Sequence, residues 1–348
     1  MQKSLMYLKS SISISAYSGC TINCKYCILS TYRKNNHIEK IINEEDLCNN
    51  LFASKYFVVN KTVISVNNVS DPFLNDILKQ STYKILDILE GKNIKNPILL
   101  ITKSYLKSFD LEYLNSKKLN ICILYTFSGL SEKYENRSLM LQTKTMKLLS
   151  KCNKNIICYW RPVIEGINST PEIINKTAEL TCKYFNYFVV SGIRINSHIK
   201  NVFEGNNIPV EIFPNSEHKV IKEETFNNIL LSLKKNNPNA KVYRKTSCVI
   251  SALFNIPDYN AHYDLKKNMC FNCTNKFICD NTNKPSLSDL KKMFFSINCN
   301  NKFSVKENII EYDGELSQED CSYILHNSGY RIKAKKIVKS NMEDVLSK

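Results

Sequence analysis

Three cysteines stand close together near the start of the chain, in the stretch SGCTINCKYC. Cys20, Cys24 and Cys27 are separated by three residues and then by two. A structural zinc ion needs four ligands, whereas three thiolates on one short loop can hold three irons of a cubane 4Fe-4S cluster and leave the fourth iron open. A zinc ion with a distant fourth ligand is the alternative. We favour the cluster, because this spacing is more specific than a lone CxxC pair.

A second group of cysteines lies far along the chain. Cys270, Cys273 and Cys279 are spaced by two and then five residues, and Cys248 lies upstream. Four thiolates saturate a metal centre, so this set predicts either a second 4Fe-4S cluster or a structural zinc ion. The cluster is favoured, because the chain already requires iron–sulfur assembly. Unliganded thiols are the third alternative.

Apolar strand candidates alternate with helix candidates along the part of the chain that contains Cys20, Cys24 and Cys27. Helical patterns separate the strand candidates, as in a parallel sheet of βα units. Six such units predict an α/β chain with a partial (β/α)6 TIM-type barrel. The strand candidates are residues 11–17, 62–68, 97–104, 120–128, 156–164 and 187–195.

The three N-terminal cysteines directly follow the first predicted strand. Ligands of parallel α/β barrels gather at the carboxyl ends of the strands. We therefore expect the cysteine loop to lie at this rim, where the polar residues that follow the other strands also meet.

Composition narrows the protein class. The chain has 348 residues and 14 cysteines, and it lacks both a secretory signal pattern and an apolar run long enough for a membrane span. We expect a cytoplasmic protein without membrane contact, whose cysteines are thiols or metal ligands. The net charge of +16 is compatible with nucleic-acid binding. Arginine is scarce among its basic residues, which weakens that interpretation because lysine is the poorer phosphate reader.

Over residues 10 to 200 the chain resembles the radical S-adenosylmethionine (radical SAM) superfamily. The cluster motif of that family, three cysteines with an aromatic residue before the last, is matched by Cys20, Cys24, Tyr26 and Cys27. The resemblance implies that S-adenosylmethionine binds the open iron and is cleaved by one electron to a 5′-deoxyadenosyl radical that abstracts a substrate hydrogen. It also implies an electron donor such as flavodoxin or ferredoxin.

The resemblance implies cofactor contacts after the second strand, in the stretch SVNNVSDPF. Its short polar side chains suit the ammonium group of the methionine moiety. An ordinary Asx turn before the proline is the equally weighted alternative. These residues are Asn67, Asn68, Ser70 and Asp71.

Later strand ends supply further implied contacts. Thr126 and Ser128 share one face of the fourth strand and suit a ribose or carboxylate. The stretch RPVIEGIN resembles the adenine-binding GxIxG stretch of the family, with Ile164 and Gly166 against the base. Arg194, after the sixth strand, suits the methionine carboxylate, although a structural ion pair is nearly as good an explanation.

Within the superfamily, the phrases VSDPF, LLITKS, RSLMLQTKTMKLLS and YWRPVIEGIN are most similar to spore photoproduct lyase-like proteins. Those lyases carry a hydrogen-donating cysteine shortly after the second strand. The stretch SVNNVSDPFLND contains none, so the repair activity is not transferred.

Three parts of the chain are predicted: a barrel over residues 1–215, a cysteine-rich metal region over 216–284 and a small basic α/β appendage over 285–348. The CxxCx5C run of the second part resembles SPASM-type extensions. The last predicted strand has a basic edge around Lys333, Lys335 and Lys336, which suits either a phosphate-bearing substrate or, more commonly, solvent.

Two functions follow. The first is a radical SAM enzyme acting on a nucleotide, a nucleic acid or a peptide. The lyase-like phrases and the positive charge favour a nucleotide or nucleic-acid substrate, whereas the SPASM-like cysteines favour a peptide. The second is a non-catalytic iron–sulfur protein for electron transfer or sensing. Polar residues at several strand ends favour the enzyme.

Overall fold

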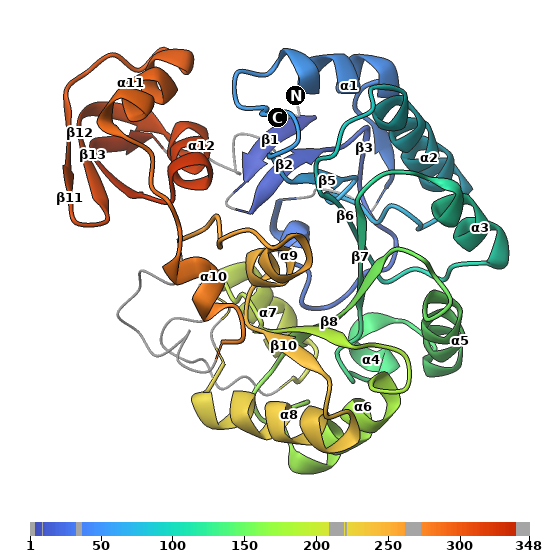
Figure 1. The fold of residues 1–348 in the computed structure, drawn as a ribbon. Helices are drawn as coiled ribbons and strands as arrows, with labels where there is room; N and C mark the ends of the chain where they lie inside the picture. The colour runs from blue at the N-terminus through green and yellow to red at the C-terminus, as the bar shows by residue number, and fades with distance from the viewer. Residues whose placement is uncertain are drawn as a thin grey trace.

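The computed structural model describes residues 4–8, 10–32, 37–208, 219, 221–261 and 273–338 (Figure 1). Its largest feature is an eight-stranded sheet in the order β1-β2-β5-β6-β7-β8-β9-β10. Neighbouring strands from β2 to β10 are parallel, and β1 is antiparallel to β2. The chain is therefore a mixed α/β protein built on a large parallel sheet.

All six predicted strands are present, in chain order and side by side. They are β2 (Ser11–Ile14), β5 (Ile64–Val66), β6 (Ile98–Thr102), β7 (Ile121–Thr126), β8 (Asn155–Val163) and β9 (Tyr187–Gly192). Two edge strands were not predicted, β1 (Leu5–Leu8) and β10 (Lys241–Tyr243). Both lie at the ends of the sheet, where each has a single neighbouring strand.

A layer of helices lies along the outside of this sheet (Figure 1). Several of them begin at a side-chain cap: Asn43, Asn75 and Thr170 each accept a hydrogen bond from a backbone N–H of the first turn. Pro171 then starts its helix without losing an intrahelical bond. The layer comprises α1 (Glu44–Ala53), α2 (Asp76–Gly91), α3 (Ser108–Ser116), α5 (Leu139–Leu149), α6 (Pro171–Thr181) and α8 (Glu223–Asn236).

The two faces of the sheet pack against different partners. Alternate side chains such as Leu100 and Ile123 join the core beneath the outer helices. Their neighbours Leu99 and Leu124 point to the other face, where helix α9 (Thr246–Phe254) packs. Alternate residues of each strand thus belong to opposite faces, and both faces are apolar and buried, as in parallel sheets covered on both sides.

The predicted C-terminal appendage forms a three-stranded sheet covered by two helices. The sheet joins β11 (Phe303–Lys306), β12 (Ile309–Ser317) and β13 (Arg331–Val338), with β12 antiparallel to β11 and parallel to β13. Helices α11 (Leu287–Ser296) and α12 (Gln318–Ser328) pack on it, with the Phe294 ring stacked on Tyr312 at 5.0 Å between centroids.

This appendage contacts the first hairpin of the large sheet. The His326 ring nitrogens lie 3.0 Å from the Tyr7 hydroxyl and 2.9 Å from Asn260 Oδ1. The Tyr56 hydroxyl donates to Asp320 Oδ1 at 2.8 Å. The contacts of Tyr7 with His326 and of Tyr56 with Asp320 thus join segments more than 200 residues apart in the chain.

At the basic edge of β13, two of the three lysines have acidic partners. Lys336 Nζ lies 2.7 Å from Glu315 Oε1, and Lys335 pairs with Asp313. These exposed pairs favour the solvated-edge interpretation over a phosphate site.

The predicted division of the chain into three parts stays a prediction. Strand β10 and helix α8 come from its second part and complete the large sheet and its outer helix layer. None of the helices within the described residues is long and apolar enough to cross a membrane.

Candidate cofactor site at the strand ends

The N-terminal cysteines lie on a loop that leaves the first parallel strand. The loop begins at β3 (Tyr17–Ser18), which pairs with β4 (Glu39–Lys40). Gly19 has φ +98°, and a Cβ atom there would collide with the carbonyl oxygen of His37. Only glycine fits at this position, where the start of the cysteine loop passes close to the backbone of His37 at the other end of the loop.

A tight turn sets the spacing of the last two cysteines. The Cys27 N–H donates to the Cys24 carbonyl at 3.0 Å, and the 3-10 helix Ile28–Tyr32 follows. The Ser30 hydroxyl donates to the Cys27 carbonyl at 2.6 Å. The Lys25 N–H donates to the Tyr134 carbonyl at 2.9 Å and so anchors the loop to α4 (Glu132–Glu135).

The three thiols are half-buried and close enough to influence one another. The pKa of Cys24 is raised to about 12: burial is the largest cause, the Lys103 ammonium acts to lower the pKa, and Glu135 and the other two thiols act to raise it. Metal ligation needs thiolates, so a positively charged metal centre must offset this burial.

The alternatives of a cluster and a single metal ion differ in how far apart their ligands lie. No three His, Cys, Asp or Glu side chains in the described ranges converge as ligands of one metal ion do. Ligands of one zinc ion all lie about 2.3 Å from the metal when they are thiolates. In a cubane each thiolate has its own iron, so the sulfurs lie farther apart. The choice of a cluster for Cys20, Cys24 and Cys27 therefore stays a prediction.

Tyr26, predicted from the motif, lies at the centre of a buried polar network. Its hydroxyl donates to Glu135 and accepts from the Lys103 ammonium. Lys103 Nζ also lies 3.0 Å from Glu135 Oε1 and 4.7 Å from the centroid of the Tyr26 ring. The Ser128 hydroxyl donates to the same Glu135 oxygen. The network ties the cysteine loop to the ends of β6 and β7.

Lys103 and Glu135 are not among the site residues predicted from the sequence. Lys103 follows its strand directly, as rim residues do, so its position was a usable signal. Glu135 lies in the exposed-looking stretch SEKYEN, and its burial at 2% exposure depends on tertiary contacts that no local pattern reveals.

The polar side chains that follow β5 make hydrogen bonds to other residues of the protein. Asn67 is fully buried: its Oδ1 accepts from the Ala16 N–H at 3.1 Å and its Nδ2 donates to the Thr82 hydroxyl at 3.0 Å. Asn68 Oδ1 accepts from the Ser13 hydroxyl at 3.0 Å.

Three further hydrogen bonds hold this turn in place. The Ser70 hydroxyl donates to the Asn67 carbonyl at 3.1 Å. Asp71 accepts from the Thr102 hydroxyl and from the Lys103 N–H, both at 2.7 Å. Such contacts are those of the Asx-turn alternative, and they position Lys103; a direct cofactor role for these four residues stays a prediction.

The residues predicted after β7 and β8 lie near the loop. Asn168, not singled out from the sequence, donates to the Ser128 carbonyl at 2.7 Å and to the Pro162 carbonyl at 2.9 Å, and accepts from the Ile164 N–H at 2.6 Å. Ile164 shares an apolar cluster with Tyr26.

The other predicted contacts at this rim differ in burial. Thr126 is buried, whereas Gly166 adopts φ +74° in a turn and donates its N–H to the Ser169 hydroxyl at 2.9 Å. Arg194 is exposed, and no ion pair or hydrogen bond joins its side chain to another described residue.

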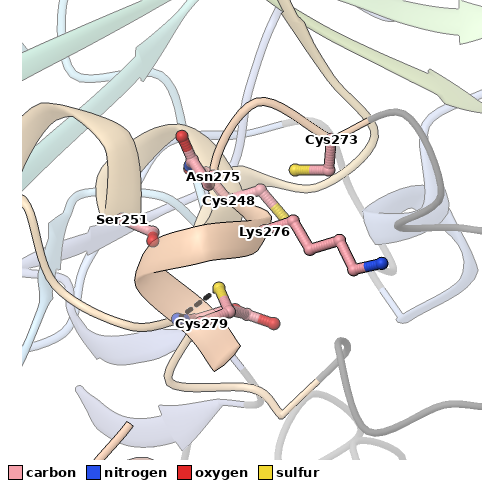
Figure 2. Close-up of a pocket in the computed structure, with 7 residues that line it drawn as sticks. Cys248, Ser251, Cys273, Asn275, Lys276 and Cys279 are labelled. Atoms are coloured by element: carbon pink, nitrogen blue, oxygen red, sulfur yellow. Dashed lines mark hydrogen bonds between the residues drawn. The ribbon is translucent and has the colours of Figure 1, made fainter. Parts of the chain in front are cut away.

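The second cysteine set is only partly described, because Cys270 lies outside the described residues. Cys248, Cys273 and Cys279 line one pocket between α9 and α10 (Lys276–Asp280), as Figure 2 shows. Cys279 is buried, and its sulfur accepts from the Asp258 N–H at 3.4 Å. The structure thus brings three of the four predicted ligands to one place, and their metal role stays a prediction.

No family model matches the chain, and no curated protein matches its sequence. Among solved structures, a spore photoproduct lyase variant with bound AdoMet and dinucleoside spore photoproduct aligns over 70% of this chain and 79% of that one, at 14% identity and a TM-score of 0.52. A second variant with the dinucleoside spore photoproduct aligns over the same shares, at 15% identity and a TM-score of 0.53. At these identities the likeness is one of fold: the chain has the fold of spore photoproduct lyase.

Proposed function

We propose that the chain is a radical SAM enzyme. The observation that carries this proposal is the loop of three half-buried thiols at the strand ends, in a fold shared with spore photoproduct lyase. A 4Fe-4S cluster with S-adenosylmethionine on its open iron supplies, when bound, reductive cleavage of the cofactor to methionine and a 5′-deoxyadenosyl radical.

The residues of this chain have distinct roles in the proposal. Cys20, Cys24 and Cys27 hold the cluster. The Lys103 ammonium favours the thiolate form of Cys24. Tyr26, bonded to Lys103 and Glu135, fixes the loop relative to the ends of β6 and β7.

Cofactor contacts beyond the cluster are proposed from the strand ends. Ile164, in one apolar cluster with Tyr26, offers an apolar surface for the adenine. Thr126, the last residue of β7, and Ser128, two residues later, offer hydroxyl groups for the ribose or the carboxylate of S-adenosylmethionine. The Asn67–Asp71 turn acts mainly by positioning Lys103, because its polar atoms already have protein partners.

The finer features are proposed on the same basis. The open parallel sheet is the partial (β/α)6 barrel of the superfamily, and the pocket at Cys248, Cys273 and Cys279 is the place for an auxiliary cluster or a zinc ion. A flavodoxin or ferredoxin supplies the electron in the cytoplasm.

The test is cofactor binding that depends on the cysteine loop. Anaerobically reconstituted protein is dialysed against radiolabelled S-adenosylmethionine, beside a variant with all three loop cysteines changed to Ala. We expect one cofactor per chain for the wild type and none for the variant. Equal binding by both proteins would refute the assignment of the site.

A further inference from the structure

A buried ion pair lies directly beside the cysteine loop. Lys103 Nζ is 3.0 Å from Glu135 Oε1, and the two side chains are 15% and 2% exposed. Both groups are hydrogen-bonded to the hydroxyl of Tyr26, which stands between Cys24 and Cys27 in the chain. A single side chain therefore separates the pair from the backbone that carries two of the three thiols.

Further contacts fix the position of Glu135 relative to this loop. The Lys25 N–H donates to the carbonyl of Tyr134, the residue before Glu135, at 2.9 Å. The Ser128 hydroxyl donates to the same Glu135 oxygen that pairs with Lys103. Backbone and side-chain hydrogen bonds thus hold the carboxylate in one place, so its charge acts on the loop from a fixed distance.

The surroundings of the pair are apolar, because Tyr26 packs against a buried cluster that includes Ile164. Coulomb interactions are several times stronger in such a place than in water, and salt screens them little. Burial is the largest cause of the raised pKa of the Cys24 thiol; Lys103 acts to lower that pKa and Glu135 acts to raise it. This agrees with the hydrogen bonds in placing both charges within reach of the loop.

Two opposite charges held beside a cluster act oppositely on its uptake of an electron. A cluster becomes more negative when it accepts an electron, and its reduction potential depends on net charge and solvent exposure. A nearby carboxylate opposes reduction and lowers the potential, whereas a nearby ammonium favours reduction and raises it. We propose that Glu135 lowers and Lys103 raises the reduction potential of the cluster on the cysteine loop, an inference that rests on the proposed function.

The test is a redox titration of the full-length, cluster-loaded protein, followed by the electron paramagnetic resonance signal of the reduced cluster. Dithionite donates one electron per cluster through soluble mediators, and S-adenosylmethionine is left out so that cofactor binding does not contribute. The signal of the loop cluster is the one that disappears when Cys20, Cys24 and Cys27 are changed together to Ala. A wild type whose iron and signal do not depend on these cysteines would refute the proposed function, and this inference with it.

Glu135→Gln keeps the shape of the side chain and removes its charge. We expect the equilibrium constant for reduction to rise at least tenfold, which is 59 mV for a one-electron couple, because the Lys103 ammonium then acts on the cluster without an opposing charge. Adding Lys103→Met to this variant should lower the constant again by at least threefold. Damage to the structure would not be reversed by the second substitution, which removes a further hydrogen-bonding group from the network.

The matched control is the buried pair of Lys79 and Asp110, which joins α2 to α3 at 2.7 Å with side chains 10% and 2% exposed. Asp110→Asn also leaves a buried lysine unpaired, and it should change the equilibrium constant for reduction by less than threefold. Three results would overturn the inference: a rise of less than threefold in Glu135→Gln, a double variant no easier to oxidise than Glu135→Gln, or an equal shift in Asp110→Asn. Because the loop cluster is present in each of these cases, the proposed function would stand.

Discussion

Lys103 and Glu135 form an ion pair at the rim of the large sheet, with 3.0 Å between Nζ and Oε1. Their side chains are 15% and 2% exposed, and both bond to the Tyr26 hydroxyl on the cysteine loop. The residues come from the end of β6 and from α4 after β7. One pair thus fixes three segments of the candidate site.

Breaking this pair should destabilise the protein. Glu135→Gln leaves the Lys103 ammonium without its counter-charge in a buried place, and we expect the free energy of unfolding to fall by about 3 kcal/mol. The measurement is urea unfolding of the cluster-free chain. The exposed pair between Glu172 and Lys176 is the matched control, and Glu172→Gln should change the free energy by less than about 0.5 kcal/mol. Equal effects of the two substitutions would show that the Lys103 pair is not buried as described.

The first cysteine set should account for one cluster. Changing Cys20, Cys24 and Cys27 together to Ala should remove about four irons per chain, because each thiolate ligates its own iron. Iron and sulfide analysis after anaerobic reconstitution measures this. Cys152→Ala, at a half-buried thiol beside Asn115, is the control and should keep all iron.

The pocket at the second cysteine set distinguishes two metal centres. Cys273→Ala combined with Cys270→Ala should remove about four further irons if the pocket holds a 4Fe-4S cluster. Loss of a single zinc ion would instead identify a structural zinc site. Unchanged iron and zinc content would show that these thiols bind no metal.

Two residues predicted to touch the cofactor should behave differently in stability measurements. Asn67→Ala should lower the free energy of unfolding by about 2 kcal/mol, because the buried Ala16 N–H loses its acceptor. Arg194→Ala should change it by less than about 0.5 kcal/mol, because Arg194 is exposed. If Asn67→Ala leaves stability unchanged and weakens only cofactor binding, its main role is at the cofactor and not in the turn.

The sheet could be predicted from the sequence because its signals are local. Each apolar strand is bounded by turn residues. The start of helix α6 is indicated in the sequence by Thr170 as the N-cap and Pro171 at the first helical position. The cysteine loop was equally local, since its three thiols and Tyr26 lie within eight residues of one another.

The rest of the site depends on which distant segments meet. Glu135 is polar in a polar stretch, and only the packing of α4 against the cysteine loop buries it. Asn168 likewise acquires a partner from a distant segment, because it donates to the Ser128 carbonyl in the loop after β7. Asn67 is a polar residue at a strand end that the sequence suggested for the cofactor. Its side-chain amide instead makes hydrogen bonds within the protein, to the Ala16 N–H and the Thr82 hydroxyl.

The most direct test of the account is reductive cleavage of S-adenosylmethionine. Dithionite-reduced, cluster-loaded protein is incubated with the cofactor without substrate, and products are separated by chromatography. We expect slow formation of 5′-deoxyadenosine and methionine by the wild type and none by the variant with Cys20, Cys24 and Cys27 changed to Ala, because the cofactor is held against the cluster only when the loop cysteines are present. A wild-type protein that carries its full iron, accepts the electron and yields no 5′-deoxyadenosine would contradict the account and favour an electron-transfer protein.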